Sequence, residues 1–509
     1  MDSDYSAKET ADVLIVGGGS AGATLAARLS EDPNRRVLLL EAGQAFAPDE
    51  VPPALSNADN VAAQAFDWGY TARGGAHSPE IPVPRGRVLG GSSAVNAAVA
   101  IRARRSDIET WGQHGVDGWS WQDVLDTFKA IENTDVGDDA YHGRLGPLSV
   151  RQRTQDDLTP GLLGFIDAAV AEGYKRVDDF NGSDAEGAGG YPVNIVDGVR
   201  QSSAAAYLTD EVRQRTNLTI LGGVVVDRVL FDGTAATGVV SGSGVAYTAN
   251  EVILSAGTYG SPAILLRSGV GPAPDLAELG IAPIADLPVG QRLQDQPFFY
   301  NAYALAADAV QMAPATGALL WFRSSLATEG ELDMHISATH LLDGSYSPTG
   351  GAIVLATAVV LPDSVGTLRI SSSDPNEQPV IDNNFLATER DQLRMLEGVR
   401  LSRRLARNPV FGPLQAGELI PGDAVGDEAL AEVVAANLAV YGHPTSTAPM
   451  GGADDPWAVV DSLGAVRGLS NLRVVDASII PRIPSTVTNL TTIMVADRIF
   501  GRVYGKTWR

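Results

Sequence analysis

The 509-residue sequence contains no cysteine, which excludes disulfides, a thiolate nucleophile and thiolate-bound metal or iron–sulfur sites. It also lacks any apolar run approaching the ~20 residues that a membrane-spanning helix needs. Residues 1–10 are polar and partly acidic, without the basic and apolar regions of a secretory signal. Together these absences predict an intracellular, cytoplasmic protein with no membrane span.

Positive charge is also scarce. The chain has 37 Lys and Arg against 61 Asp and Glu, a net charge of −24, and its basic residues form no cluster. Such a surface repels nucleic acid and anionic lipid, so we expect neither as a partner. Because the acidic residues are scattered, they favour a role in solubility over the attraction of a cationic substrate. His335 and His340 do not have the spacing of an HExxH metal motif, and no metal site is predicted.

What the sequence does contain is a complete β–α–β pattern at its start. Val13–Val16 is a continuous apolar run, typical of a strand that is buried on both faces. A helical stretch follows as far as Ser30, and it carries Leu25 and Leu29 on one face. Val37–Leu40 is the expected second parallel strand.

Three glycines and an acidic residue occupy the positions that a dinucleotide-binding loop requires. Gly17 permits the tight turn, Gly19 lets the backbone approach a pyrophosphate, and Gly22 allows the helix to pack closely on the strand. The helix N-terminus offers free N–H groups and a positive dipole end to phosphate. Glu41, 19 residues beyond Gly22, can accept hydrogen bonds from a ribose diol. This pattern predicts a bound dinucleotide but does not separate NAD from FAD.

Several later blocks resemble those of the glucose–methanol–choline (GMC) oxidoreductases. Residues 86–109, which include Gly-Arg-Val-Leu-Gly-Gly-Ser-Ser, and residues 257–271 are similar to the two signature blocks of that family. Residues 200–204 and 361–375 resemble other family blocks, and 474–498 resembles its C-terminal flavin block. All occur in the family's order, which chance alone would hardly produce.

The resemblance implies that the dinucleotide is FAD. Family position implies that Val88 and Asn96 touch the flavin and that the backbone at Val226 holds the adenine. Val95 stands where some family members carry a histidine that is bonded to the flavin, so a non-covalent FAD is implied. The full set of implied cofactor-binding residues is Gly17, Gly19, Ser20, Gly22, Glu41, Ala42, Arg87, Val88, Gly90, Gly91, Ser92, Asn96, Val226, Ala256, Gly257, Asp476, Ala477, Asn489, Leu490 and Thr491.

His443 and Asn489 are the catalytic residues that the resemblance implies. Residues 441–447 are similar to the family's His-Pro-x-Gly-Thr motif, whose histidine is the active-site base, and Asn489 would be its partner. A neutral imidazole can accept the hydroxyl proton, and an amide N–H can hold the substrate oxygen while hydride passes to flavin N5. Ser446 and Thr491 stand where the family usually has Gly and Pro, which changes backbone freedom near the flavin.

The other histidines have weaker patterns. His77 and His114 lie in polar, loop-like sequence and are expected at the surface, and His142 is expected in a turn. His335 lies in a strand-like stretch, where it could line a substrate pocket or be a satisfied, half-buried histidine. The apolar spacing near the C-terminus predicts a helix from residue 493 to about residue 503, so that Asn489 precedes it.

The length suits two or three domain-sized bodies. The resemblance implies an α/β fold in which residues 1–155, 196–295 and 441–509 form a Rossmann-like FAD-binding domain. Residues 156–195 and 296–440 would form an interleaved α+β substrate-binding domain on an antiparallel sheet. Substrate would enter the crevice between the two.

The implied reaction is oxidation of an alcohol CH–OH group to an aldehyde or ketone. The partners would be a small-molecule alcohol and an electron acceptor, either O2 or a quinone-like compound. The His/Asn pair resembles that of bacterial alcohol and hydroxymethylfurfural oxidases. Two alternatives stay open: a GMC-fold hydroxynitrile lyase, which keeps FAD and the base without redox chemistry, and a sugar (glycoside) oxidase.

Overall fold

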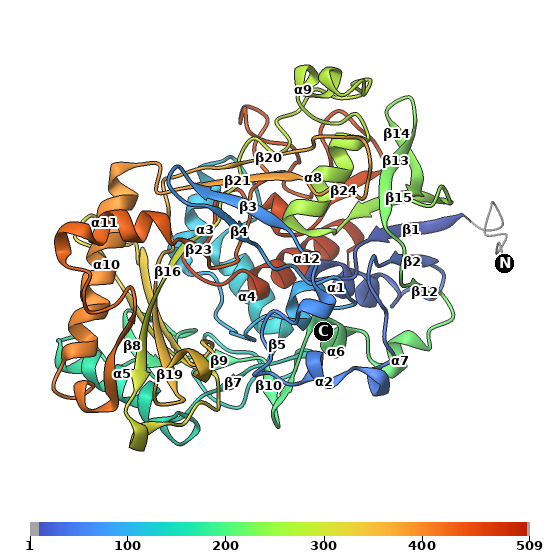
Figure 1. Ribbon diagram of the computed structural model, residues 1–509. Coiled ribbons are helices and arrows are strands. Elements are labelled where there is room, and N and C mark those ends of the chain that lie inside the picture. Colours follow the sequence, from blue (N-terminus) through green and yellow to red (C-terminus); the bar gives the residue numbers. More distant parts are fainter. Residues whose placement is uncertain (1–9, 506–509) are drawn as a thin grey trace.

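The computed structural model describes residues 10–505, and two large sheets dominate it (Figure 1). One sheet carries strands from the start, the middle and the end of the chain, and the other is built mostly from residues beyond 296. The prediction about a signal segment concerns residues 1–10, of which 1–9 lie outside the described residues. In the part of the chain that is described, no helix is long and apolar enough to cross a membrane.

The first sheet is the predicted Rossmann-like unit. Its core strands are parallel in the order β12-β2-β1-β15-β24, and β15 continues into an antiparallel meander with β14 and β13. The strands are β1 (Ala11–Val16), β2 (Val37–Leu40), β12 (Leu218–Leu221), β13 (Val226–Asp232), β14 (Ala235–Ser241), β15 (Ala246–Leu254) and β24 (Leu472–Val474). The predicted β–α–β pattern is confirmed, with α1 (Ser20–Leu29) between β1 and β2.

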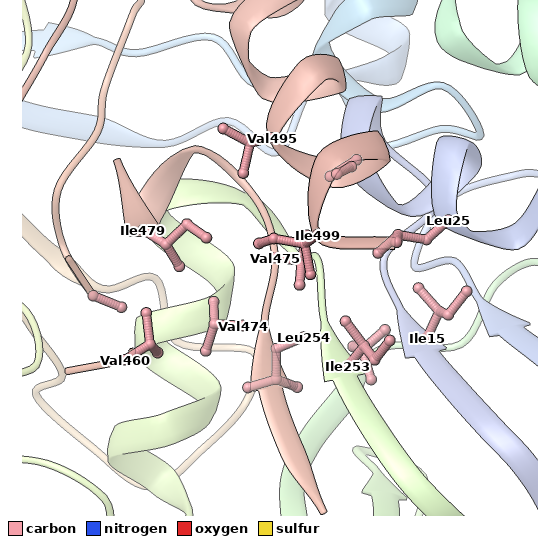
Figure 2. Close-up of a cluster of buried hydrophobic side chains, with 14 of the residues drawn as sticks. Ile15, Leu25, Ile253, Leu254, Val460, Val474, Val475, Ile479, Val495 and Ile499 are labelled. Atoms are coloured by element: carbon pink, nitrogen blue, oxygen red, sulfur yellow. The ribbon is translucent and has the colours of Figure 1, made fainter. Parts of the chain in front are cut away.

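The core of this sheet joins distant parts of the chain (Figure 2). Ile15 of β1 packs in one buried cluster with Ile253 of β15, Val474 of β24 and Ile499 of α12 (Asn489–Tyr504). Burying such aliphatic side chains supplies most of the driving force for this packing. The last helix therefore belongs to the same core as the first strand.

The second sheet is antiparallel throughout, as predicted, in the order β22-β16-β19-β18-β17-β8, with β23 paired to β16. Its strands are β8 (Gly187–Gly190), β16 (Pro297–Leu305), β17 (Thr316–Phe322), β18 (Met334–Thr339), β19 (Ala352–Val359), β22 (Gln415–Ile420) and β23 (Ala439–Val440). Helices α5 (Pro160–Ala171) and α10 (Glu389–Arg407) cover one face. Along β16, Phe299 points into the core under these helices, while its neighbours Phe298 and Tyr300 face the opposite side.

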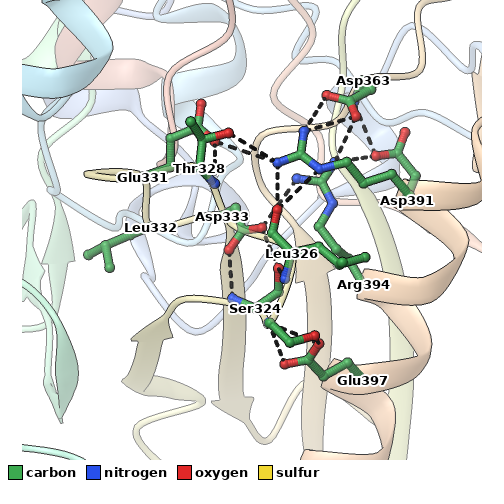
Figure 3. Close-up of polar contacts among 12 residues, drawn as sticks. Ser324, Leu326, Thr328, Glu331, Leu332, Asp333, Asp363, Asp391, Arg394 and Glu397 are labelled. Carbon is green, nitrogen blue, oxygen red and sulfur yellow. Dashed lines mark hydrogen bonds and ion pairs between the residues drawn. The ribbon is translucent and has the colours of Figure 1, made fainter.

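A buried charge cluster fixes α10 to the start of β18 (Figure 3). The Arg394 guanidinium, with no exposed side-chain surface, lies 3.2 Å from the Asp333 carboxylate and also pairs with Asp391. Asp333 in turn accepts hydrogen bonds from the backbone and the hydroxyl of Ser324. Because both carboxylates are buried, Arg394 is the charge that offsets the cost of their desolvation.

A smaller sheet crosses the predicted domain division and was not anticipated. Its order is β20-β21-β3-β4, and the early strand β3 runs parallel to the late strand β21. The strands are β3 (Thr71–Gly75), β4 (Glu80–Pro82), β20 (Thr367–Arg369) and β21 (Val380–Phe385).

Two-stranded sheets pair β5 (Glu132–Asn133) with β6 (Leu148–Ser149), β7 (Arg151–Gln152) with β9 (Pro192–Val193), and β10 (Ile195–Val196) with β11 (Val199–Arg200). The remaining helices are α2 (Pro53–Ser56), α3 (Arg105–Gly112), α4 (Trp121–Ile131), α6 (Ser203–Tyr207), α7 (Asp210–Arg213), α8 (Gly257–Arg267), α9 (Ala273–Glu278) and α11 (Asp427–Ala436).

The last helix begins earlier than predicted. The sequence placed Asn489 before a helix starting at residue 493, whereas α12 starts at Asn489 itself. The first turn was missed because Thr491 and Thr492 are polar although they are buried, so it lacks the apolar spacing on which the prediction relied. Asn489 thus lies in the first turn of the helix.

Candidate active site

A deep cavity lies between the two large sheets and is lined by residues of both. We call its two parts the glycine-loop end and the histidine end. The predicted residues that line the glycine-loop end are Gly17, Gly19, Ser20, Glu41, Ala42, Gly91, Ser92, Asn96, Val226, Ala256, Gly257, Asp476, Ala477 and Asn489. The histidine end contains His443 together with Tyr191, Phe298, Tyr300, Thr316, Ser337 and Tyr441.

Backbone packing shapes the glycine-loop end. A Cβ at Gly22 would overlap the carbonyl oxygen of Gly17, so no larger residue fits where α1 leaves the loop. Gly91 has a φ of +52°, and a Cβ there would lie 2.7 Å from the Cα of Gly19. The two glycine-rich segments therefore touch through their main chains, and Gly19 and Gly91 both lie at the cavity wall.

Two helix N-termini meet at this end. Neither α1, which follows Gly19, nor α12, which follows Thr488, has a side-chain hydrogen bond capping its first turn. The Ser20 hydroxyl donates a 2.7 Å hydrogen bond to Oδ1 of Asn489 and so ties the two first turns together. Uncapped N–H groups and two positive dipole ends make this a site for an anion such as a pyrophosphate.

Two buried carboxylates flank the glycine-loop end. Glu41 accepts hydrogen bonds from the backbone N–H groups of Gly18 (2.8 Å) and Gly43 (2.7 Å), and burial raises its pKa to about 7. Asp476 accepts from the Gly257 N–H (2.9 Å) and the Ser261 hydroxyl (2.6 Å), and burial raises its pKa too. Glu41 thus stands at the end of β2, where a ribose-binding acid was predicted.

The other predicted cofactor residues lie behind the cavity wall: Gly22, Arg87, Val88, Gly90, Leu490 and Thr491. The Arg87 guanidinium lies 4.7 Å from the Trp68 ring centre, and Trp68 does line the cavity. Val88 packs in a small cluster with Val95, and Thr491 accepts a hydrogen bond from the Ala103 N–H. These residues support the loops that face the cavity.

His443 is held by two neighbouring residues. Its backbone N–H donates to Asp295 (2.8 Å), and its Nδ1 lies 2.7 Å from Oε1 of Gln296. Burial, and then the positive charge of Arg85, lower the pKa of His443 to about 3. The Arg85 guanidinium also donates to the carbonyl of Gly442 (2.8 Å). The imidazole is therefore neutral at physiological pH.

Arg85 and Gln296 were missed by the sequence analysis. Both act on His443 from segments far from it in the chain, which no local pattern reveals. The one available signal was position in the chain, because Gln296 is the first residue of the segment 296–440 that was predicted to belong to the substrate-binding domain.

Ser446 occupies the position that is usually glycine in the resembling motif. Its φ of +69° keeps the left-handed backbone that glycine favours. The Ser446 hydroxyl donates to the carbonyl of Ile480 (2.8 Å), which stabilises this conformation, and its oxygen also lies 3.2 Å from Oε1 of Gln294.

Aromatic rings and hydroxyl groups line the histidine end. Phe298 stacks on Tyr441 with ring centres 4.3 Å apart, and the Tyr441 ring lies 4.4 Å from that of His443. Ser337 and Thr316, on adjacent strands, add hydroxyls. We call the second, antiparallel sheet the substrate sheet, and none of its strands contributes a charged side chain to the cavity wall.

The segment from Val487 to Asn489 contacts both the histidine end and the glycine-loop end of the cavity. Val487 lines the cavity and packs in a cluster with Tyr191 of the histidine end and Trp321 of β17. Asn489, two residues later, is bonded to Ser20 of the glycine loop. Among the described residues, no hydrogen bond joins Asn489 to His443.

The remaining histidines lie away from the cavity wall. His335 is fully buried behind Tyr441, with Nδ1 3.4 Å from the Tyr441 hydroxyl, rather than half-buried or lining the cavity. His142 is buried between two carboxylates, and His114 is half-buried beside Asp455. Only His77 is exposed as expected. In the described range 10–505, no group of three or more His, Asp or Glu side chains could hold a metal ion.

Comparison with known proteins identifies the family. The N-terminal GMC oxidoreductase model matches residues 11–298, and the C-terminal one matches residues 362–496. The chain is 35% identical to an oxygen-dependent choline dehydrogenase of Photobacterium profundum, over 98% of this chain and 94% of that protein.

Solved structures agree. Pyridoxine 4-oxidase from Mesorbium loti has a TM-score of 0.89 at 31% identity, over 98% of this chain and 100% of that one. A formate oxidase from Aspergillus oryzae, solved in a study of FAD modification, has a TM-score of 0.87 at 25% identity, over 98% and 100%. The resemblance drawn from the sequence is confirmed: the chain belongs to the GMC oxidoreductases, FAD-dependent enzymes that act on CH–OH donors.

Proposed function

We propose that this protein oxidises a neutral alcohol bearing a ring, to an aldehyde or ketone, with non-covalently bound FAD and with His443 as the base. One observation carries the proposal: a neutral, half-buried histidine lines the same cavity as two uncapped helix N-termini. A base for the alcohol and a cradle for a dinucleotide thus share one space.

The glycine-loop end fits FAD. The first turns of α1 and α12 would hold the pyrophosphate, and Glu41 would bind the adenosine ribose near Val226. When bound, FAD supplies the two-electron acceptor for the alcohol carbon. Val95 lines the cavity and offers no nucleophile, which supports a non-covalent cofactor.

His443 would take the hydroxyl proton of the alcohol. Because its pKa is lowered, the base form is present at neutral pH and is lost only as pH falls through the lowered pKa. For Asn489, the bond from Ser20 supports the predicted cofactor role, since it holds the amide at the phosphate side. Its predicted role at the substrate oxygen stays a prediction.

The lining of the histidine end supports an uncharged substrate. The carboxylates that line the cavity are Glu41, Glu377 and Asp476, and none comes from a strand of the substrate sheet. Stacked aromatic rings beside hydroxyl groups suit a flat ring that carries a CH–OH group. A quaternary ammonium alcohol such as choline would find rings here but no carboxylate from that sheet to offset its charge.

The experiment is anaerobic mixing of the FAD-bound protein with benzylic, furanic and pyridine alcohols, with sugars and with choline. We expect loss of flavin absorbance near ~450 nm with the ring-bearing alcohols, faster than with choline or sugars. Admitting O2 or a quinone then identifies the acceptor from the rate at which the absorbance recovers.

Each alternative has its own outcome. Fastest reduction by sugars would favour a sugar oxidase, and fastest reduction by choline would overturn the neutral substrate. No reduction by any alcohol, together with cleavage of a cyanohydrin, would establish a hydroxynitrile lyase instead. The cytoplasmic location and the residue ranges of the two domains remain predictions.

A further inference from the structure

We propose that Gln296 is a positioning residue that fixes His443 in one tautomer, with the proton on Nδ1 and the free lone pair on Nε2. The inference rests on the proposed role of His443 as the base. It specifies which of the two ring nitrogens takes the proton and which residue decides this.

The first step is the orientation of the Gln296 amide. The side chain is fully buried, and its Nε2 donates to the carbonyls of Val360 (2.9 Å) and Pro484 (3.0 Å). A backbone carbonyl only accepts hydrogen bonds. Turning the amide over would place its oxygen against both carbonyls, which is costly for buried polar groups. The amide is thus held with Oε1 toward His443.

The second step is the proton on the imidazole. Oε1 can only accept, and it lies 2.7 Å from Nδ1 of His443, so Nδ1 must donate. A neutral imidazole carries one N–H, which leaves the lone pair on Nε2. The alcohol proton is therefore transferred to Nε2, while the Nδ1–H bond stays on Oε1 and stabilises the positive charge that forms.

The backbone holds this pair in place. Oδ1 of Asp295 accepts from the backbone N–H groups of both Gln296 (2.7 Å) and His443 (2.8 Å). The Tyr441 N–H donates to the Gln296 carbonyl (3.0 Å). Three hydrogen bonds thus hold the two segments in register next to the pairing of β16 with β23, and they support the 2.7 Å contact between the side chains.

Three variants separate the possibilities. Gln296→Met keeps the length of the side chain but removes the acceptor, so either ring nitrogen can carry the proton. Gln296→Glu keeps an acceptor at Nδ1 and adds negative charge, which raises the His443 pKa and moves the acid limb of the pH–rate profile to higher pH. It also removes the two hydrogen bonds to the carbonyls of Val360 and Pro484, so we expect it to be less stable than the wild type. Gln294→Met is the matched control, because Gln294 is also buried but binds Ser446 and Ile483 instead of a histidine.

The direct test is a long-range 1H–15N spectrum of the FAD-bound protein labelled with 15N-histidine. Only six histidines contribute, and His443→Ala identifies the signals of His443. We expect Nδ1 protonated and Nε2 unprotonated in the wild type and in Gln296→Glu, and a changed pattern in Gln296→Met. A wild-type spectrum with the proton on Nε2 would overturn the proposal, whether or not any alcohol reduces the flavin.

The kinetic test uses flavin reduction by the best alcohol. We expect Gln296→Met to lower kcat by ~10-fold or more, with FAD content kept and little change in KM. The base is still present, but a fraction of the molecules carry the proton on Nε2, where it blocks transfer from the alcohol. Gln296→Glu should recover part of the rate at high pH. If Gln296→Met and Gln294→Met behave alike, the role is structural only, and the proposal is wrong. If Gln296→Met does not fold, the wild-type spectrum still decides, because it alone shows which ring nitrogen of His443 carries the proton.

Discussion

The two ends of the cavity are built in different ways. The glycine-loop end is made of main chain: glycines that leave no room for a Cβ, and the uncapped first turns of α1 and α12. The histidine end is made of side chains, with Arg85, Gln296 and Tyr441 placed around His443. In the proposed function, the first end is a generic cradle for phosphate, and the second carries the chemistry of alcohol oxidation.

This difference determines how each end fails. Replacing a tightly packed glycine at the glycine-loop end acts through steric overlap, so it should remove the cofactor and destabilise the fold together. A substitution at the histidine end should change rates while the cofactor stays bound. Variants of the residues that pack behind each end can separate these two kinds of failure.

The largest expected effect concerns the charge cluster beneath the histidine end. Arg394→Leu leaves Asp333 and Asp391 buried without their cation, and we expect unfolding free energy to fall by ~3–5 kcal/mol in urea titrations. The exposed pair of Arg105 and Glu109 provides the control, where Arg105→Leu should lower the free energy of unfolding far less. Equal losses in the two variants would mean that the cluster does not brace the sheet.

At the glycine-loop end, Gly22→Ala should be severe although only one methyl group is added. The new Cβ overlaps the Gly17 carbonyl, and we expect a loss of ~2–3 kcal/mol together with loss of bound FAD after gel filtration. Gly112→Ala, also in a helix but with open space around it, should be neutral or slightly stabilising. Full retention of FAD by Gly22→Ala would refute the steric argument.

His142 bridges Glu132 and Asp179, which fall in the two different predicted domains. Burial lowers the pKa of His142, but hydrogen bonds to Asp179 and Glu132 outweigh it and raise the pKa to about 9. A raised folded-state pKa gives stability that is present below about pH 6.5 and is lost as pH rises through about 9. We expect this loss to be on the order of 1–2 kcal/mol between about pH 6 and 10, measured by urea unfolding. The loss should be smaller in His142→Gln, and an unchanged slope in that variant would rule out His142 as its source.

The smallest effect sharpens the assignment of Asn489. Removing its contact with Ser20 should weaken FAD binding by ~5- to 10-fold, since one partly buried hydrogen bond contributes about 1 kcal/mol. Asn489→Ala, Ser20→Ala and the double variant should give similar, non-additive losses in fluorescence titrations. If Asn489→Ala instead binds FAD normally and slows flavin reduction, the predicted role at the substrate oxygen is correct.

What could be predicted from the sequence follows the same division. The β–α–β unit with Gly17, Gly22 and Glu41 was predictable, because a strand, a tight loop and a helix are specified by neighbouring residues. Apolar spacing also gave the body of α12, but not its first turn, where polar Thr491 is buried by tertiary packing.

The histidine end could be predicted only in part. His443 was found through a motif of adjacent residues, whereas Arg85 and Gln296 reach it from 358 and 147 positions away. The sheet that pairs β3 with β21 was missed for the same reason, since its strands are short and far apart in the chain. Contacts of this kind form only in the assembled fold and produce no periodic pattern in the local sequence.

The most direct test of the account is the rate of anaerobic flavin reduction by the preferred alcohol in His443→Ala. The account predicts a rate lower by ~100-fold or more, with FAD bound at the wild-type ratio, because only the base is removed. Reduction at close to the wild-type rate, or loss of FAD together with activity, would contradict the separation of a cofactor-binding end from a chemical end.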